Sequence, residues 1–302
     1  MGYRSALAAG HVRLCAEPSG RYTRTGRQRP GTGRLPGRRT LNPDPDTIMQ
    51  NPHAGDKDVI HAPHAPLTDY YPTESARRGW VADMFNSTAP DYNRIEKILG
   101  FGSGPWYRRQ ALLRAGLRPG MLALDVGVGT GLVAQQAVAI LGDPTAVTGV
   151  DPSPGMLQNA VLPAGVRLVE GRAEALPFPD SSVDFLSMGY ALRHISDLAV
   201  AFAEFHRVLK PGGRLCILEI TCPDHPVQKA LLKTYARYLV PLMARMASRS
   251  GNTSVLWRYY WDTIEACAPP EEVVRTLQKA GFDNAGRHLE LGMFSEYQAV
   301  KA

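Results

Sequence analysis

The feature that most constrains how this chain can fold is a glycine-rich run that directly follows a short apolar segment. It spans Leu122–Gly131 and reads LALDVGVGTG. Glycine adopts backbone conformations that other residues avoid, and it lets a ligand lie against the main chain. Three alternating glycines where a strand passes into a helix therefore predict a ligand-binding turn. A strand-to-helix turn without a ligand is the alternative interpretation.

Short apolar segments alternate with helical patterns along most of the chain. Strands are predicted over Met121–Val126, Ala146–Val150, Val166–Val169, Val183–Met188, Arg214–Ile220 and two later runs that end in Phe294–Val300. Helices are predicted over Ala76–Tyr92, Trp106–Ala115, Gly131–Leu141, Pro154–Asn159, Leu198–Leu209 and Glu271–Ala280. This alternation predicts an α/β fold in which helices cover both faces of a mostly parallel sheet.

The spacing of the glycines separates two classes of ligand. A dinucleotide-binding fingerprint reads G-x-G-x-x-G, and counted from Gly127 its third glycine would fall on Leu132. The spacing here is G-x-G-x-G, preceded by an acid. A carboxylate suits a pyrophosphate poorly, but it can face the positively charged methionine end of S-adenosylmethionine. The first predicted contacts of that cofactor are Asp125, Gly127, Gly129 and Gly131.

A second acidic residue, Asp151, ends the next predicted strand, VTGVD. Its carboxylate can accept hydrogen bonds from both ribose hydroxyls of the cofactor, each worth roughly 1–3 kcal/mol when charge-assisted. An aspartate at a strand end also often caps the following helix. Because Ser153 is a competing cap, the ribose contact is the favoured role of Asp151.

The positive charge of the chain is concentrated near its N-terminus. Of the net charge of +6, residues 1–40 contribute +8 through nine arginines and Glu17, so residues 41–302 carry −2. This balance argues against nucleic acid as a partner of the folded part. The sequence contains no stretch of about 18 apolar residues without charges, so no membrane-spanning segment is predicted. Four cysteines without Cys-x-x-Cys spacing favour a reducing, cytoplasmic compartment and no metal site.

Residues 1–66 are rich in Arg, Gly, Pro and Thr and lack apolar periodicity. Such a segment buries too little surface to offset its ordering entropy, so we expect a disordered tail before a single domain over residues 75–302. A basic interaction arm, an organelle transit peptide and sequence upstream of the true start are the competing explanations. Met49, where the composition changes, is the favoured candidate start.

Several further segments carry a resemblance to a known family. They are Val81–Tyr92 with ILGFG at 98–102, AEALPFPD at 173–180, YALRH at 190–194, RVLKPGGRL at 207–215 and, more loosely, the aromatic run Trp257–Ile264. With the glycine loop, they make the chain from about Val81 onward resemble the ubiquinone/menaquinone biosynthesis C-methyltransferase family. The resemblance implies a Rossmann-like class I methyltransferase with a mostly parallel seven-stranded sheet and an antiparallel last strand. It also implies S-adenosylmethionine as cofactor, a prenylated quinol as acceptor, and cofactor-binding positions at Thr130, Asp151, Arg172, Ala173 and Gly189.

Four positions depart from the family pattern. Arg172 stands where an Asp or Asn commonly meets the adenine amino group, and an arginine cannot accept that hydrogen bond, so the backbone or Glu174 would replace it. His194 replaces an Asn, Gly189 a Ser and Thr263 a Ser. The acceptor can therefore be a small aromatic other than a quinol. An O- or N-methyltransferase of an unrelated metabolite and a binding protein without turnover are the alternative functions.

Arg193 and His194 are the predicted catalytic residues. Carbon methylation of a phenolic ring requires loss of a hydroxyl proton, which His194 can take directly or through water. Arg193 can stabilise the resulting phenolate. The alternatives are a structural salt bridge for Arg193 and a helix flank for His194. Tyr92 and Tyr259 are the predicted substrate contacts, with core packing an equal alternative for Tyr92.

A helix is predicted over residues 226–248, with Lys229, Lys233 and Arg237 spaced four apart. A solvated basic face over a packed apolar face is the favoured interpretation. A lid over a lipid-like acceptor, in peripheral contact with an anionic membrane surface, is the alternative.

Overall fold

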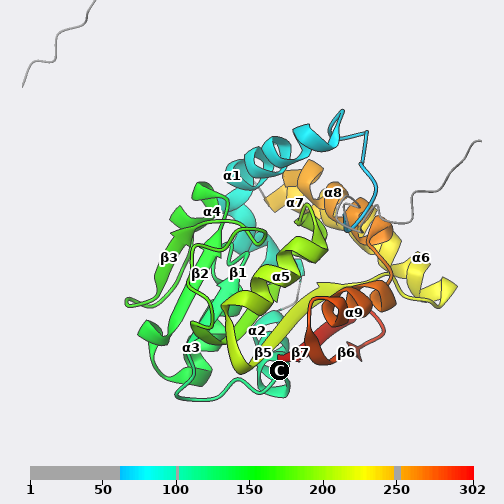
Figure 1. Cartoon of the computed structure of the whole chain (residues 1–302). Coiled ribbons are helices and arrows are strands. Elements are labelled where there is room, and N and C mark those ends of the chain that lie inside the picture. The colour runs from blue at the N-terminus through cyan, green and yellow to red at the C-terminus, as the bar shows by residue number, and fades with distance from the viewer. Residues whose placement is uncertain (1–61, 100–101, 248–252) are drawn as a thin grey trace, which may run out of the picture. The chain divides into compact units, whose positions relative to one another are not determined.

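A seven-stranded sheet forms the centre of the described part of the chain, which comprises residues 62–99, 102–247 and 253–302 of a computed structural model (Figure 1). The strands are β1 (Ala123–Val126), β2 (Val147–Asp151), β3 (Arg167–Glu170), β4 (Val183–Gly189), β5 (Leu209–Ile220), β6 (Phe282–Glu290) and β7 (Phe294–Lys301). Their order across the sheet is β3-β2-β1-β4-β5-β7-β6. β1 to β5 pair in parallel, and β7 pairs antiparallel with both β5 and β6. The predicted α/β sheet with an antiparallel last strand is confirmed.

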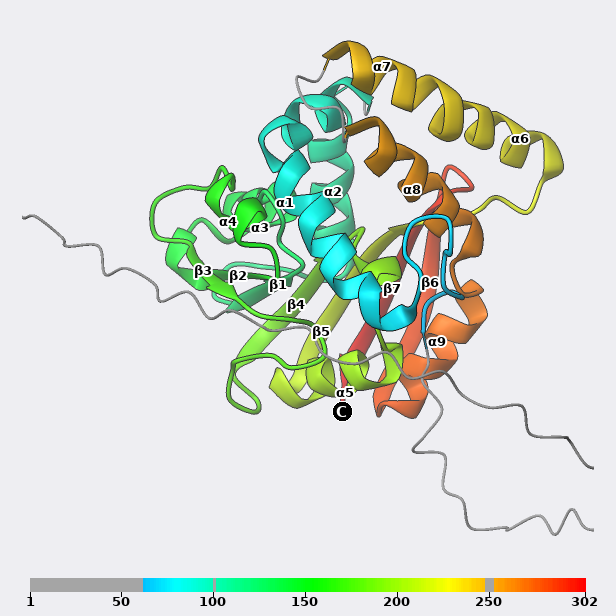
Figure 2. The ribbon, with the colours of Figure 1, turned by 90° about the horizontal axis from the view of Figure 1, so that it is seen from above.

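Helices cover both faces of this sheet, as predicted (Figure 2). One face packs against α2 (Gly104–Arg114) and α3 (Leu132–Leu141), and the other against α5 (Leu198–Val208) and α9 (Pro270–Lys279). Successive strand residues point to opposite faces. In β1, Ala123 belongs to the core beside α2 and α3, whereas Leu124 belongs to the core beside α5 and α9. Because both faces are covered there, the central strands β1, β4 and β5 are mostly buried and apolar.

The other helices lie near the edge of the sheet where the parallel strands end. α1 (Glu74–Leu99) crosses above this edge and contacts α4 (Pro154–Gln158) and α8 (Thr253–Ala266). α6 (Pro226–Thr234), a π-helical turn (Tyr235–Leu239) and α7 (Val240–Ala247) follow β5, and the last two pack on α8. Short 3₁₀ turns lie at Pro144–Ala146 and Leu192–His194.

The segment from α6 to α7 does not separate a solvated basic face from a packed apolar face as predicted. Lys229 and Lys233 pair with Glu265 of α8, and Arg237 pairs with Asp262 of the same helix. Several apolar side chains of the segment are instead exposed: Val227, Leu231, Tyr238, Leu239 and Leu242. The acidic side chains of α8 orient this segment. The prediction used only the spacing of residues within 226–248, and α8 lies outside that range.

The folded domain begins before the predicted boundary at residue 75. The Pro63 carbonyl accepts a hydrogen bond at 2.6 Å from the amide of Ala268, and His64 and Tyr71 are buried. The contacts of Pro63 and His64 are with distant segments, since the His64 ring lies 3.1 Å from the Arg193 carbonyl oxygen, so local composition did not reveal them. The remainder of the predicted tail, with Met49, lies outside the described residues.

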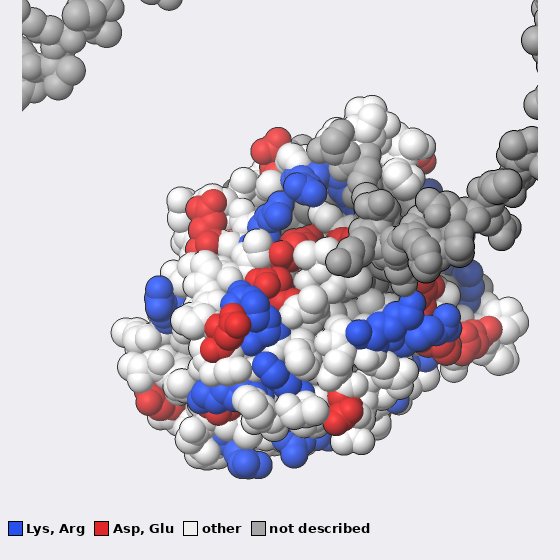
Figure 3. Space-filling view, viewed as in Figure 1, with Lys and Arg blue, Asp and Glu red and all other residues white. Residues whose placement is uncertain are grey.

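Charged side chains of both signs intermix on the face shown in Figure 3. None of the described helices combines the length and the apolar character that crossing a membrane requires. Within the same described ranges, no group of three His, Cys, Asp or Glu side chains is arranged to hold a metal ion.

Candidate active site

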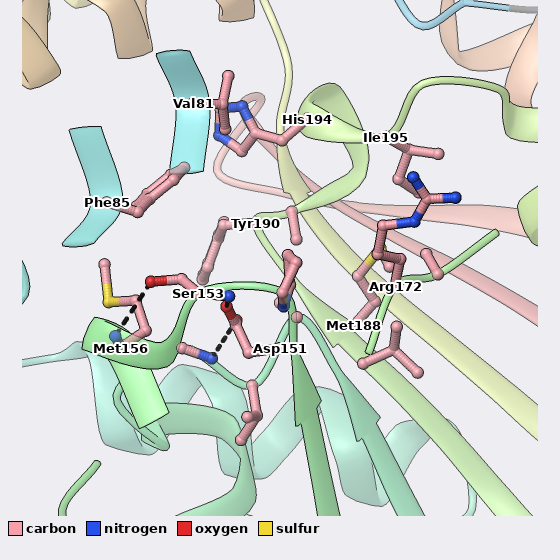
Figure 4. A pocket seen from close by; sticks show the side chains of 18 of the residues that line it. Val81, Phe85, Asp151, Ser153, Met156, Arg172, Met188, Tyr190, His194 and Ile195 are labelled. Carbon is pink, nitrogen blue, oxygen red and sulfur yellow. Dashed lines mark hydrogen bonds between the residues drawn. The ribbon is translucent and has the colours of Figure 1, made fainter. Parts of the chain in front are cut away.

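A cavity of about 450 Å³ lies at the carboxyl ends of the parallel strands, beneath α1 (Figure 4). In open α/β sheets this edge is the usual place for a ligand. We call one side the loop wall; it consists of Gly127–Thr130, Asp151–Ser153 and Gly171–Glu174. We call the other side the aromatic wall; it consists of Val81 and Phe85 from α1, His194, and Tyr260 from α8. The cavity thus lies between strand-end loops and helical side chains.

The glycine loop turns sharply because its three glycines have left-handed backbone conformations. Gly127, Gly129 and Gly131 have φ angles of 69°, 54° and 94°, which residues with a Cβ rarely adopt. The amide of Gly127 donates to the Val150 carbonyl at 2.8 Å and fixes the loop against β2. A Cβ on Gly127 would also lie 2.8 Å from that of Ala191. The predicted strand-to-helix turn is present, and glycine is the residue that fits it.

Asp151 ends β2 with its carboxylate in the loop wall. Oδ2 accepts a hydrogen bond from the amide of Gly129, and Oδ1 accepts one from the amide of Ser153, each at 2.8 Å. Burial raises the pKa of this carboxyl to about 6, and the two amides oppose that rise. The Ser153 hydroxyl accepts from the amide of Met156 at 3.1 Å and caps α4. Since Ser153 is the cap, the remaining lone pairs of Asp151 can accept ligand hydroxyls.

Two predicted cofactor contacts lie behind the loop wall. Asp125 is buried, accepts a hydrogen bond from the Ser187 hydroxyl at 2.7 Å, and is not among the residues that line the cavity. Burial raises its pKa to about 7. A Cβ on Gly131 would meet the Leu162 side chain at 2.7 Å, so this position faces protein. The expectation that Asp125 faces the charged end of the cofactor is therefore corrected: Asp125 supports the loop from below.

The positions assigned through the resemblance do line the cavity. Arg172 and Ala173 belong to the loop wall, and Gly189 ends β4. A Cβ on Gly189 would lie 2.5 Å from Cγ2 of Val133, so the serine of the family pattern does not fit without a shift. The Arg172 side chain is exposed at the cavity edge (Figure 4). Glu174 Oε1 accepts a hydrogen bond at 2.7 Å from the amide of Ser196. This oxygen of Glu174, the predicted substitute for the adenine contact, is therefore already bound to the loop before α5.

His194 is the polar member of the aromatic wall. Its ring meets that of Phe85 edge to face, with 5.2 Å between centres, and stacks against that of Tyr259 at 5.6 Å. Nδ1 lies 3.4 Å from the Tyr259 hydroxyl, and Nε2 has no hydrogen-bond partner among the described residues. Burial, together with the charge of Arg193, lowers the pKa of His194 well below its usual 6.5. The ring is therefore neutral at pH 7.

Arg193 lies behind the aromatic wall, which corrects the prediction that it contacts a phenolate. Its side chain is fully buried in an ion pair with Glu219 of β5 and does not line the cavity. Its guanidinium carbon lies 4.5 Å from the centre of the Tyr260 ring, a cation–π distance. The arrangement is the salt bridge named as its alternative role, and Tyr260 is the group through which Arg193 reaches the cavity.

The tyrosine that reaches the cavity from α8 is Tyr260, whereas the predicted Tyr259 is fully buried and does not line it. Tyr92 does line the cavity, and its hydroxyl lies 2.9 Å from that of Tyr260. Neighbouring residues on a helix point about 100° apart. A cluster of aromatic residues does not by itself show which member faces the ligand.

Two asparagines of α1 were missed by the sequence-based prediction. Asn86 Oδ1 accepts hydrogen bonds from the Ser153 hydroxyl at 2.7 Å and the amide of Gly155 at 2.8 Å. Asn93 Oδ1 accepts one from the Thr130 hydroxyl at 2.5 Å. The two asparagines stand seven residues apart and so share one helix face, which was the available signal. They join α1 to two segments of the loop wall.

The strand order, the glycine loop after β1 and the carboxylate that ends β2 together define an S-adenosylmethionine-dependent methyltransferase of the Rossmann-like class. The chain belongs to the ubiE/COQ5 methyltransferase family, whose model matches residues 73–301. It is 33% identical over 218 residues to the demethylmenaquinone methyltransferase of Staphylococcus aureus, covering 69% of this chain and 87% of that protein. It is 31% identical over 217 residues to the ubiquinone/menaquinone biosynthesis C-methyltransferase UbiE of Pseudoalteromonas translucida, covering 70% and 85%.

Solved structures share the fold. An S-adenosylmethionine-dependent methyltransferase of Thermotoga maritima superimposes with a TM-score of 0.53 at 21% identity, over 73% of this chain and 99% of that one. Phosphoethanolamine N-methyltransferase 2 of Haemonchus contortus superimposes with a TM-score of 0.52 at 19% identity, over 73% and 60%. The enzyme uses S-adenosylmethionine, and the cavity fits it: a Cβ is excluded at Gly127, and Asp151 retains acceptor lone pairs.

Proposed function

We propose that this enzyme transfers the methyl group of S-adenosylmethionine to a ring carbon of a quinol that carries an apolar chain. The observation that carries the proposal is the aromatic wall, in which Val81, Phe85 and Tyr260 face the cavity. Such a lining favours a ring and a hydrocarbon chain over a polar metabolite. The relatives named for menaquinone and ubiquinone biosynthesis support the same class of acceptor.

In this proposal the loop wall binds the cofactor, which when bound supplies an electrophilic methyl group. Asp151 accepts the two ribose hydroxyls, and Arg172 and Ala173 lie beside the adenine. Gly127 and Gly129 let the ligand approach the main chain. The walls hold the acceptor carbon in line with the methyl group and exclude water, which accounts for much of the catalysis in such a transfer.

His194 holds the ring hydroxyl of the acceptor through Nε2. Burial raises the pKa of Tyr259 to about 12, so its hydroxyl stays protonated and is able to donate to Nδ1 of His194. Nε2 then carries the ring hydrogen and donates a hydrogen bond to the acceptor oxygen, which enters the transfer as the phenolate after losing its proton to water. As the ring carbon takes the methyl group and the bond from sulfur to methyl breaks, that negative charge moves into the ring, and the hydrogen on the attacked carbon then leaves to water as a proton. Because the pKa of His194 is low, the ring retains a proton poorly, and we assign it this donor role in place of general base.

The acceptor is tested with the purified full chain, methyl-labelled S-adenosylmethionine and a reduced demethylquinol carrying two prenyl units. We expect label in the quinol, at a ring carbon identified by NMR. Fractionated cell lipids and polar metabolites are assayed in parallel. Label confined to polar products, or attached to oxygen or nitrogen, would contradict the proposal.

The aromatic wall is tested with Phe85→Ala. We expect KM for the prenylated quinol to rise about tenfold, because the variant loses a large apolar contact, while the Kd for S-adenosylhomocysteine changes little. Trp106→Ala is the matched control, since Trp106 is 65% exposed and does not line the cavity. Equal KM values for the two variants would show that the acceptor lies elsewhere.

The same proposal puts the enzyme in the cytoplasm, at the surface of the membrane that holds its acceptor. The described cysteines Cys216, Cys222 and Cys267 are free thiols, which suits a reducing compartment. The exposed apolar side chains of α6 and α7 offer a surface for peripheral contact. Cell fractionation tests the location. We expect the enzyme in the cytoplasmic fraction or bound to the cytoplasmic side of the membrane, and recovery in an extracytoplasmic fraction would contradict the proposal.

A further inference from the structure

Arg108 of α2 is a buried cation to which none of the roles above assigns a function. It is 4% exposed and lines the cavity. Its Nη2 donates to Glu96 Oε1 at 2.5 Å, whereas its Nε and Nη1 have no hydrogen-bond partner among the described residues. A buried donor without a partner destabilises the protein, and more so when it is charged. A ligand that brings an anionic oxygen would satisfy these donors.

The contacts of Arg108 place it at the end of the cavity next to the glycine loop. Its partner Glu96 stands three residues after Asn93, so the two lie on the same side of α1. Asn93 in turn accepts a hydrogen bond from the Thr130 hydroxyl of the glycine loop. Arg108 is also close enough to Asp125, below the loop, to oppose the rise in pKa that burial causes there.

The Arg108 guanidinium lies beside Tyr190, which follows β4 and faces the cavity (Figure 4). The guanidinium carbon is 5.5 Å from the centre of the Tyr190 ring, within the range of a cation–π contact. Tyr190 has a left-handed backbone with φ of 60°, a strained conformation for a residue other than glycine. Strain of this kind concentrates at functional sites, and here it occurs where the tyrosine ring meets the cation.

The order of the strands indicates which end of the cofactor reaches Arg108. β3, β2, β1 and β4 are consecutive neighbours in the sheet, and the cavity residues at or just after their carboxyl ends are, in the same order, Arg172, Asp151, Gly127 and Tyr190. With the ribose at Asp151 and the adenine beside Arg172, the amino-acid end extends past Gly127 toward Tyr190. We propose that Arg108 binds the carboxylate of S-adenosylmethionine through one of its unpartnered donors, Nε or Nη1.

The surroundings of Arg108 suit this role. Nε–H and Nη1–H point away from different edges of the guanidinium plane, so a carboxylate oxygen can accept a charge-assisted hydrogen bond from either one. Glu96 holds Nη2 and is therefore a positioning residue. Gly104, one helical turn before Arg108, leaves the space that the guanidinium occupies, since a Cβ there would lie 2.5 Å from Nη1.

The test measures Kd by calorimetry for S-adenosylmethionine and for decarboxylated S-adenosylmethionine, which keeps the nucleoside, sulfonium and amine. We expect the wild-type protein to bind the first at least tenfold more tightly, a difference of about 1.4 kcal/mol. Arg108→Gln should remove this preference by weakening only the binding of S-adenosylmethionine. Arg108→Lys, which keeps the charge but loses the planar donors, should retain part of it. Arg109→Gln, on the same helix and outside the cavity lining, is the matched control.

The proposal rests on the ribose contact at Asp151, and the ligand pair separates the two. Asp151→Asn should weaken both ligands equally if Asp151 binds the ribose, and unchanged Kd values for both would mean that the ribose contact fails. Equal weakening of both ligands by Arg108→Gln, or none, would overturn the role of Arg108. So would an unchanged Kd with a raised KM for the acceptor, because Arg108 would then bind the acceptor oxygen. If Arg108→Gln does not fold, the wild-type preference and Arg108→Lys decide the question.

Discussion

The loop wall and the aromatic wall of the same cavity are assembled in opposite ways. In the loop wall each segment lies within a few residues of a strand end, and backbone amides make the main contacts, as those of Gly129 and Ser153 do with Asp151. The aromatic wall brings together Phe85 and His194 from separate segments, and ring contacts hold it. One wall follows from short stretches of sequence and the other from long-range packing.

This difference separates the two specificities of the enzyme. In the proposed function, backbone geometry and one carboxylate, held by the sheet, bind the cofactor. The acceptor is assigned to side chains from α1, α8 and the turn after β4, whose positions depend on buried ion pairs and aromatic contacts. Substitutions behind the aromatic wall should therefore change stability and acceptor binding, while those in the loop wall should change cofactor affinity.

The largest effect is expected for Arg193→Met, which leaves the buried Glu219 carboxylate without its partner. Removing one member of a buried pair costs about 3–5 kcal/mol, measured as the free energy of unfolding in urea. The double variant Arg193→Met/Glu219→Gln should recover part of that loss. The folded single variant should keep its Kd for S-adenosylhomocysteine within about threefold. A large change in that Kd would show that the two walls are coupled.

The next effect concerns Asp125 beneath the loop wall. Its folded pKa of about 7 exceeds its ordinary value of 3.8, so between these values the folded protein binds a proton more tightly than the unfolded chain. This group therefore lowers the free energy of unfolding as pH rises from about 4 to 7. Asp125→Asn has no carboxyl that titrates here. The free energy of unfolding of the variant minus that of wild type should therefore rise by roughly 2 kcal/mol from pH 5 to pH 8. Parallel stability curves without cofactor would refute the assignment.

Asp151→Asn tests the loop wall directly. We expect its Kd for S-adenosylhomocysteine to rise at least tenfold, about 1.4 kcal/mol, with acceptor KM affected less. Because the pKa of Asp151 is about 6, the wild-type carboxyl protonates as pH falls through 6 and loses acceptor capacity. Wild-type affinity should weaken over that range, while that of the variant stays nearly constant. Equal pH profiles in calorimetry would exclude Asp151 as the ribose contact.

The smallest effect is expected for Tyr92→Phe, which removes one partner of the 2.9 Å hydrogen bond with Tyr260. Acceptor KM should rise about two- to fivefold, in line with the loss of roughly 0.5–1 kcal/mol for a neutral hydrogen bond. Cofactor Kd should stay the same. Tyr238→Phe is the matched control, since Tyr238 is 64% exposed. A change in cofactor Kd without a change in KM would place Tyr92 with the loop wall.

Local patterns were sufficient to predict most of the fold. Strands buried on both faces appear as short apolar runs, and α5 shows its apolar face at helical spacing, so the sheet and its covering helices were predictable. The glycine loop and Asp151 were predictable for the same reason, because their conformations are set within a few residues.

The errors arose where a distant group decides the position of a side chain. Arg193 faces Glu219 of β5 and so lies behind the cavity. Tyr260 and not Tyr259 reaches the ligand side of α8. The basic residues of the α6–α7 segment turn toward acids on α8. In each case two orientations satisfy the local pattern, and the partner that selects between them is remote in sequence.

The sequence by itself thus determined the α/β sheet, the cofactor class and the two strand ends to which we assign the cofactor, since backbone conformation and alternation are local properties. Only the tertiary structure decided which side chains face the acceptor and which support them from behind. Burial makes that decision: a buried charge such as Arg193 requires a partner, and the partner's position fixes where the charge points. Arg108 is also a buried charge, and two of its donors have no partner among the described residues. By the same requirement a ligand should supply that partner, which we propose is the carboxylate of the cofactor.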